Sequence, residues 1–205
     1  MSFARPAFLV LCLAATPGAA ADFSDPTWPC IQRKVENLSL GLMWPLPVDL
    51  TLTEGDAALE RDVAELAETL ILRRIPLEDL QGQVDGFAAT YEGDADKLGL
   101  VFARAFDTIS KRRTRIIKGI GDFSLGQIAL AEKIDVARAE IDTLMAASEP
   151  DFDRVDALEE QIDWDQVIHT DRQRSITYLC ETPTLLERRL FGIAQMLQQA
   201  IREDG

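Results

Sequence analysis

The chain offers few side chains for acid–base, nucleophilic or metal chemistry. His169 is the only histidine in 205 residues, and histidine is the usual general base and metal ligand near neutral pH. The Glu-x-x-His motif of di-iron bundles is absent, because Gln166 stands three residues before His169. No Gly-x-Ser-x-Gly, P-loop or dinucleotide-binding glycine pattern occurs. We therefore expect no catalytic residues, no metal and no cofactor, in a protein that is not an enzyme.

Residues 1–21 have the pattern of a secretory signal peptide. Arg5 gives a positive start, residues 7–15 are apolar, and a group of small residues ends at Ala21. The apolar run is too short to span the roughly 30 Å hydrocarbon core of a bilayer, which makes a membrane anchor the less favoured interpretation. We expect cleavage near Ala21 and a periplasmic or secreted mature protein.

Cleavage removes Cys12 and leaves two cysteines, Cys30 and Cys180. Their spacing is neither that of a C-x-x-C redox motif nor that of a metal site. An even pair in an oxidising compartment favours one structural disulfide. Closing a loop of about 150 residues would stabilise the fold by roughly 5 kcal/mol in the chain-entropy model.

The chain is strongly acidic, with 35 Asp and Glu against 21 Lys and Arg and a formal net charge of −14. Phosphate contacts need a concentrated positive surface, so we expect no nucleic-acid partner. Five cations nevertheless lie close together in the sequence: Lys111, Arg112, Arg113, Arg115 and Lys118. The favoured interpretation is neutralisation by the acidic segment 54–73. The alternative is a docking patch for an anionic partner or lipid headgroups, with a membrane surface as the less favoured partner.

A second concentration of charge lies at 149–165, where many acidic residues accompany a single cation, Arg154. A solvated helix surface explains most of this pattern. Two aromatic residues among the acids, Phe152 and Trp164, mark a candidate contact site for a basic partner.

Two shorter helices are predicted after the first fifty residues. Apolar residues recur at steps of three and four from Leu59 to Leu70 and again from Leu77 to Tyr91. This spacing predicts helices at about 54–73 and 77–91, separated by Pro76.

A longer heptad pattern follows. It runs through alternating steps of four and three from Phe102 to Leu144, with Arg113 and Gln127 as its polar members, and resumes from Val155 to Ala200. We expect helices at about 94–147, 151–182 and 184–203. A kink or short break is expected at 119–126, which holds three glycines, and an interruption at Pro183.

The two heptad segments must fold back on each other because only a short turn joins them. The resulting antiparallel register places Phe102 opposite Leu197, Ile120 opposite Leu179 and Ile141 opposite Leu158. It also gathers four polar residues into one hydrogen-bonded layer, expected to fix the register at some cost in stability: Gln127, Asp165, His169 and Arg172.

Residues 22–52 differ from the rest, because they hold four of the nine prolines and two of the three tryptophans. We interpret them as an extended strap fastened by Cys30, in which residues 38–44 form either a helical turn or a strand. Trp28 and Trp44 are expected to cover an exposed core edge rather than to stack on a ligand.

The predicted fold is therefore all-α. A long antiparallel, coiled-coil-like helical hairpin carries two shorter helices on its base and an extended N-terminal strap, and 53–205 form a single helical domain. An extended hairpin offers surface rather than a concave pocket, so we expect a scaffold, adaptor or chaperone-like protein that binds another protein, with self-association left open. The alternative is a binding protein for a small apolar or amphipathic ligand, held in the basal core by Phe87, Phe102, Phe106 and Phe191.

Overall fold

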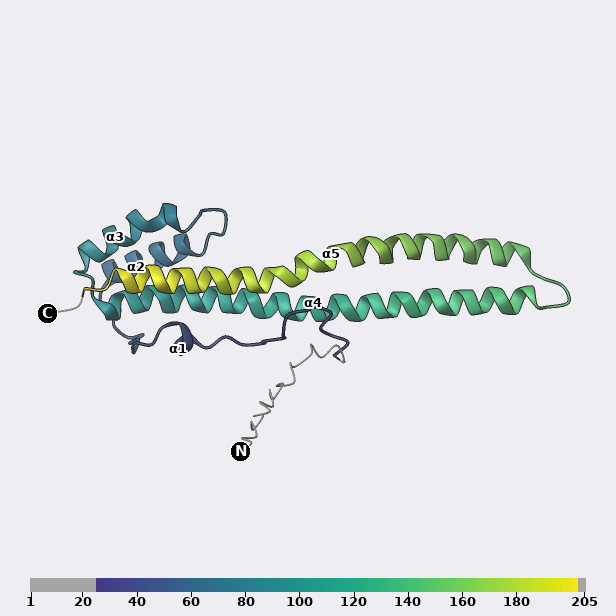
Figure 1. The fold of residues 1–205 in the computed structure, drawn as a ribbon, viewed down its shortest axis with the longest axis horizontal. Coiled ribbons are helices and arrows are strands. Elements are labelled where there is room, and N and C mark those ends of the chain that lie inside the picture. Colours follow the sequence, from purple (N-terminus) through teal and green to yellow (C-terminus); the bar gives the residue numbers. More distant parts are fainter. Residues whose placement is uncertain (1–24, 203–205) are drawn as a thin grey trace, which may run out of the picture.

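A computed structural model describes residues 25–202, and the predicted signal peptide at 1–21 lies outside them. The described part is helical and contains no strand. The elements follow in the order α1 (Leu40–Met43), α2 (Ala57–Leu70), the 3₁₀ turn η1 (Glu78–Leu80), α3 (Gln81–Thr90), α4 (Ala95–Met145) and α5 (Phe152–Gln199). Helices α4 and α5 form the predicted antiparallel hairpin, with α2 and α3 on its base (Figure 1).

The caps and the register of the hairpin follow from the sequence. The Asp94 carboxylate accepts hydrogen bonds from two backbone amides at the start of α4, and Asp151 does the same for one amide of α5. These residue pairs, predicted to face across the hairpin, each lie in or against one buried cluster: Phe102 and Leu197 at the base, Ile120 and Leu179 in the middle, Ile141 and Leu158 in the outer part.

Helix α4 is continuous, so the break predicted at 119–126 is wrong. A glycine costs only about 1 kcal/mol in a helix interior, and the buried side chains of Ile117 and Ile120 hold this stretch against its neighbours. Gly121 has a packing role instead. A Cβ atom there would lie 3.4 Å from Thr27, so the absent side chain allows the strap to approach α4 closely.

Helix α5 is also continuous, and the predicted interruption at Pro183 is not present. Pro183 is buried inside the helix. Near the proline, other donors serve the carbonyls of the preceding turn: the Thr182 hydroxyl donates to the oxygen of Tyr178 at 3.0 Å, and the Gln32 amide donates to that of Cys180. Figure 1 shows α5 bending where it leaves the basal half of the hairpin. The proline therefore bends the helix without ending it.

The shorter helices begin and end inside their predicted bounds. Asp56 caps α2 by accepting from the amides of Ala58 and Leu59, and the predicted helix at 77–91 is divided into η1 and α3. Arg189 of α5 fixes the connection between α2 and η1, because its Nε donates to the oxygen of Leu70 at 2.8 Å and its Nη1 to that of Ile75 at 2.7 Å.

The strap runs beside α4 as an extended chain, and residues 38–44 contain the helical turn α1 rather than a strand (Figure 1). Trp28 and Trp44 are 6% and 1% exposed, and the Trp44 ring stacks on Phe102 with centroids 5.3 Å apart. The expected role of both tryptophans as covers for the core is confirmed. Among residues 25–202, none of the helices combines the length and apolar character of a bilayer-spanning segment.

Candidate interaction surfaces

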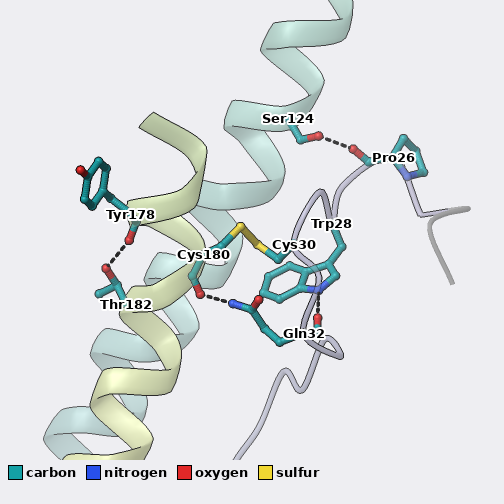
Figure 2. The surroundings of a disulfide bond; sticks show 8 residues. All are labelled: Pro26, Trp28, Cys30, Gln32, Ser124, Tyr178, Cys180 and Thr182. Carbon is teal, nitrogen blue, oxygen red and sulfur yellow. Dashed lines mark hydrogen bonds between the residues drawn. A yellow bond between two sulfur atoms is a disulfide. The ribbon is translucent and has the colours of Figure 1, made fainter. Parts of the chain in front are cut away.

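The disulfide fastens the strap to the middle of the hairpin, as predicted. Cys30 and Cys180 are bonded with their Cα atoms 5.5 Å apart. Figure 2 shows the Trp28 indole beside the disulfide, with its Nε1 donating to the oxygen of Gln32 at 2.6 Å. The Ser124 hydroxyl donates to the oxygen of Pro26 at 2.6 Å. The strap is thus held by a covalent bond, a buried indole and hydrogen bonds to both long helices.

A polar cluster secures the first described residues of the strap. Asp25 accepts hydrogen bonds from the Thr27 hydroxyl at 2.6 Å, the Thr27 amide at 2.8 Å and the Lys34 ammonium at 3.0 Å. These donors, led by the Thr27 hydroxyl, lower the pKa of the Asp25 carboxyl to about 2.

The five clustered cations do not form one surface. Arg113 is 3% exposed, which removes it from the candidate partner contacts. Its Nε donates to a Glu187 carboxylate oxygen at 2.8 Å, and its Nη1 donates to the oxygen of Glu36 at 3.3 Å. The cause is its place on the hairpin seam, where only a paired guanidinium can be buried.

The other four cations are exposed, and the expected neutralisation by the acidic segment 54–73 is not observed. Lys111 pairs with Asp107 of its own helix at 2.8 Å. Within the described chain, no carboxylate oxygen lies within 4 Å of the Arg112, Arg115 or Lys118 side-chain nitrogens. Glu60 of α2 pairs with Arg104 instead.

A groove of about 1170 Å³ lies between the strap, α2 and α4. It is not the basal core that the sequence suggested as a ligand site. Of the four phenylalanines named for that site, Phe87 and Phe102 are packed in the core, Phe191 is 50% exposed, and Phe106 lines the groove. The sequence offered no sign of this groove, because the strap that forms one wall has no regular pattern.

The predicted polar layer forms in part. The Gln127 amide nitrogen donates to the backbone oxygen of His169 at 3.0 Å. Asp165 is 8% exposed, and its carboxylate lies 2.8 Å from the Lys133 ammonium, although outside good hydrogen-bond geometry. Arg172 points to solvent and does not join the layer, because its flexible side chain reaches water from the edge of the seam.

The outer half of the hairpin, residues 123–179, is called the outer arm below. Figure 1 shows α4 and α5 extending there without a third helix. Its apolar cluster has four buried residues, Ile134, Ala137, Leu158 and Ile162, with Leu130, Ile141 and Leu144 half-buried against them. The sparse core leaves large side chains of both helices on the surface.

Phe152 and Trp164 are 60% and 65% exposed, as a contact role requires. They do not belong to one surface, because twelve residues place them about 120° apart around α5. Trp164 lies instead with Val167 and Ile168, which are 54% and 41% exposed at helical spacing. Tyr178, 75% exposed, continues this line along the helix. We call Trp164, Val167, Ile168 and Tyr178 the apolar stripe, of which the sequence analysis identified only Trp164.

Comparison of the chain with known protein families, curated proteins and solved structures finds no match. Function is therefore inferred from the chemistry of these surfaces.

Proposed function

We propose that the protein is a periplasmic or secreted, non-enzymatic interaction module that binds another protein through the apolar stripe of the outer arm. The observation that carries this proposal is the adjacency of Trp164, Val167 and Ile168 on an arm of two helices. Clustered large apolar side chains on the surface are typical of sites that bind proteins, and tryptophan is enriched among the residues that dominate binding energy.

The thin core of the arm supports the same proposal. Stable domains pack secondary structure in layers around a common core, whereas the outer arm buries a single seam between two helices, with four buried residues in its apolar cluster. That seam also holds the charged Asp165, whose burial is costly even beside Lys133. A partner seated on the apolar stripe would supply the layer that this half of the hairpin lacks.

Charge favours a basic partner over a second copy of the chain. The tip of the arm, residues 149–165, carries many more carboxylates than cations, and its one cation, Arg154, pairs with Glu140 at 2.7 Å. Two such tips would repel each other, while a partner with Lys or Arg around an apolar patch would be attracted. We infer a partner surface of that kind.

The proposed location rests on the disulfide and on the leader pattern. A structural disulfide is compatible with an oxidising compartment outside the cytosol. We propose that residues 1–21 direct export and are removed near Ala21. Sequencing the N-terminus of the protein recovered from its natural compartment tests this, and an uncleaved Met1 would contradict it.

Photo-cross-linking in the native host tests the binding surface. A benzophenone amino acid placed at Trp164 should give a discrete adduct with one other protein. The matched control is the same substitution at Gln173, which is exposed on α5 about 180° away from Trp164. Equal adducts at both positions, or none at Trp164, would overturn the proposal. An adduct between two copies of the chain would replace the basic partner with self-association.

A further inference from the structure

A second surface, independent of the outer arm, lies where the strap passes along α4. The groove of about 1170 Å³ adjoins a smaller hollow of about 340 Å³, and Asn37 and Thr114 line both. Together they follow α4 from Leu100 to Leu125, a distance of about 37 Å at 1.5 Å per residue. We call the two hollows the strap groove. Its size is ample for a small ligand.

The inner end of the strap groove is apolar. Its side chains come from three parts of the chain, namely the strap, α2 and α4. They are Leu40, Val48, Leu50, Val63, Leu100 and Phe106. The outer end is cationic, because Lys111, Arg115 and Lys118 line it at the spacing of one helix face. Apolar and positive linings are thus separated along the length of the groove.

The charges at the outer end are only partly neutralised. Three of the lining carboxylates, those of Glu36, Glu60 and Asp107, are each paired with a neighbouring cation. Arg115 has no such partner within the described residues, and Asp122 lies two helical turns farther along. The Ser110 hydroxyl, at the junction of the apolar and cationic parts, is buried without a hydrogen-bond partner. An anionic group beside Arg115 would supply the partner that this guanidinium lacks.

We propose that the strap groove binds a single-chain anionic amphiphile of the fatty-acid type. The acyl chain lies along the inner wall of Leu40, Val48 and Phe106, and the carboxylate lies near Arg115. A free amphiphile fits better than a bilayer surface, because five of the six apolar lining side chains are buried or half-buried, and only Leu50, at 71% exposure, projects from the protein. This inference does not rest on the proposed function of the outer arm.

Titration calorimetry with the full mature protein, at ligand concentrations below micelle formation, tests the proposal. Dodecanoate should bind about tenfold more tightly than decanoate, because each buried methylene strengthens binding about fourfold at most. Dodecanol and dodecylamine should each bind at least about tenfold more weakly than dodecanoate, because neither offers an anion to Arg115.

Three variants locate the site. Arg115→Glu should weaken dodecanoate binding at least about tenfold. Arg112→Glu makes the same charge change on an exposed residue outside the groove lining and should leave binding unchanged. Thr114→Trp should block the junction of the two hollows and abolish binding. Circular dichroism checks that each variant keeps the helical fold.

Four results would overturn the proposal. Equal affinity for the acid, the alcohol and the amine would show unspecific apolar binding. Equal losses in Arg112→Glu and Arg115→Glu would show an effect of net charge alone. Loss of binding in Trp164→Ser would place the acyl chain on the outer arm. Binding to anionic phospholipid vesicles without binding to dodecanoate would assign the cations to a membrane surface.

Discussion

The Arg113 guanidinium joins three parts of the molecule at one point. It is buried on α4, ion-paired with Glu187 of α5 and hydrogen-bonded to the strap at Glu36. The heptad pattern places Arg113 on the seam, whereas its neighbours in sequence suggest a surface cation. In the structure Arg113 is buried on the seam, because packing of the hairpin determines which face of the helix is buried.

Removing the partner of this guanidinium should destabilise the protein. We expect Glu187→Ala to lower the free energy of unfolding by about 2 kcal/mol, because the buried Arg113 guanidinium loses its counterion. The loss stays below that of a fully buried ion pair, since Glu187 is itself partly exposed. The double variant Arg113→Met/Glu187→Met should lose less stability than the sum of the losses in Arg113→Met and Glu187→Met, which with the wild-type protein complete the cycle. Urea denaturation of the four proteins tests this, and strictly additive losses would contradict it.

The Asp25 cluster gives a pH-dependent prediction at the same scale. Its folded pKa of about 2 lies below the ordinary value of 3.8, so its stabilisation is complete above about pH 4 and is lost as the pH falls through about 2. An NMR titration should show a midpoint near 2 for Asp25. Thr27→Val, which removes the first of its donors, should move the midpoint upward. An unchanged midpoint in the variant would show that the hydroxyl does not control this pKa.

At the scale of elements, the strap is fastened by a disulfide to a hairpin whose two long helices also pack on each other. We expect Cys30→Ser to lower the free energy of unfolding by about 2–5 kcal/mol and to expose the strap to proteolysis, while the helices persist on their own seam. The double variant Cys30→Ser/Cys180→Ser should behave like the single one. A collapse of the helical circular dichroism signal would contradict a hairpin that stands independently.

The outer seam provides a second test of an element. Asp165→Leu should leave the stability of the outer arm unchanged or raise it, by up to about 4 kcal/mol, because it replaces a buried charge with an apolar group. Lys133→Ala should lower it, because the carboxylate at 8% exposure loses its counterion. Hydrogen exchange of the arm measures both effects. A clear loss of protection in Asp165→Leu would show that the polar layer stabilises the register.

The long periodic elements could be predicted from sequence, but their continuity could not. The heptad pattern gave the hairpin and its facing residues, since a seam of this length has few alternatives. The glycines near Gly121 and the proline at Pro183 carry local penalties that packing against the strap and the other helix exceeds. The strap groove was beyond prediction, because it depends on where an irregular segment settles.

At the scale of the whole molecule, the apolar side chains are divided unequally between the base and the outer arm. The basal cluster draws on the strap, α2, α3, α4 and α5, whereas the outer cluster draws on α4 and α5 alone. We expect the base, which has the larger core, to resist local unfolding more than the outer arm does. We therefore expect a rigid base that presents a less stable arm to a partner.

Substitutions on the arm should separate binding from folding. Trp164→Ala should weaken partner binding at least about tenfold without lowering the melting temperature, because the side chain is largely exposed. Phe152→Ala should have a smaller effect, since Phe152 lies on a different face of α5. Binding assays with the partner cross-linked at Trp164 measure both. Equal effects would show that the partner surrounds the tip rather than lying on the apolar stripe.

Hydrogen exchange of the free and the partner-bound protein tests the proposed arm function most directly. In the free protein, amides of residues 130–170 should exchange roughly 100-fold faster than those of the basal part of α4, and they should become protected when the partner binds. Protection that appears only around Phe87, Phe102 and Phe106, with the outer arm unchanged, would contradict the account and place the binding site in the base.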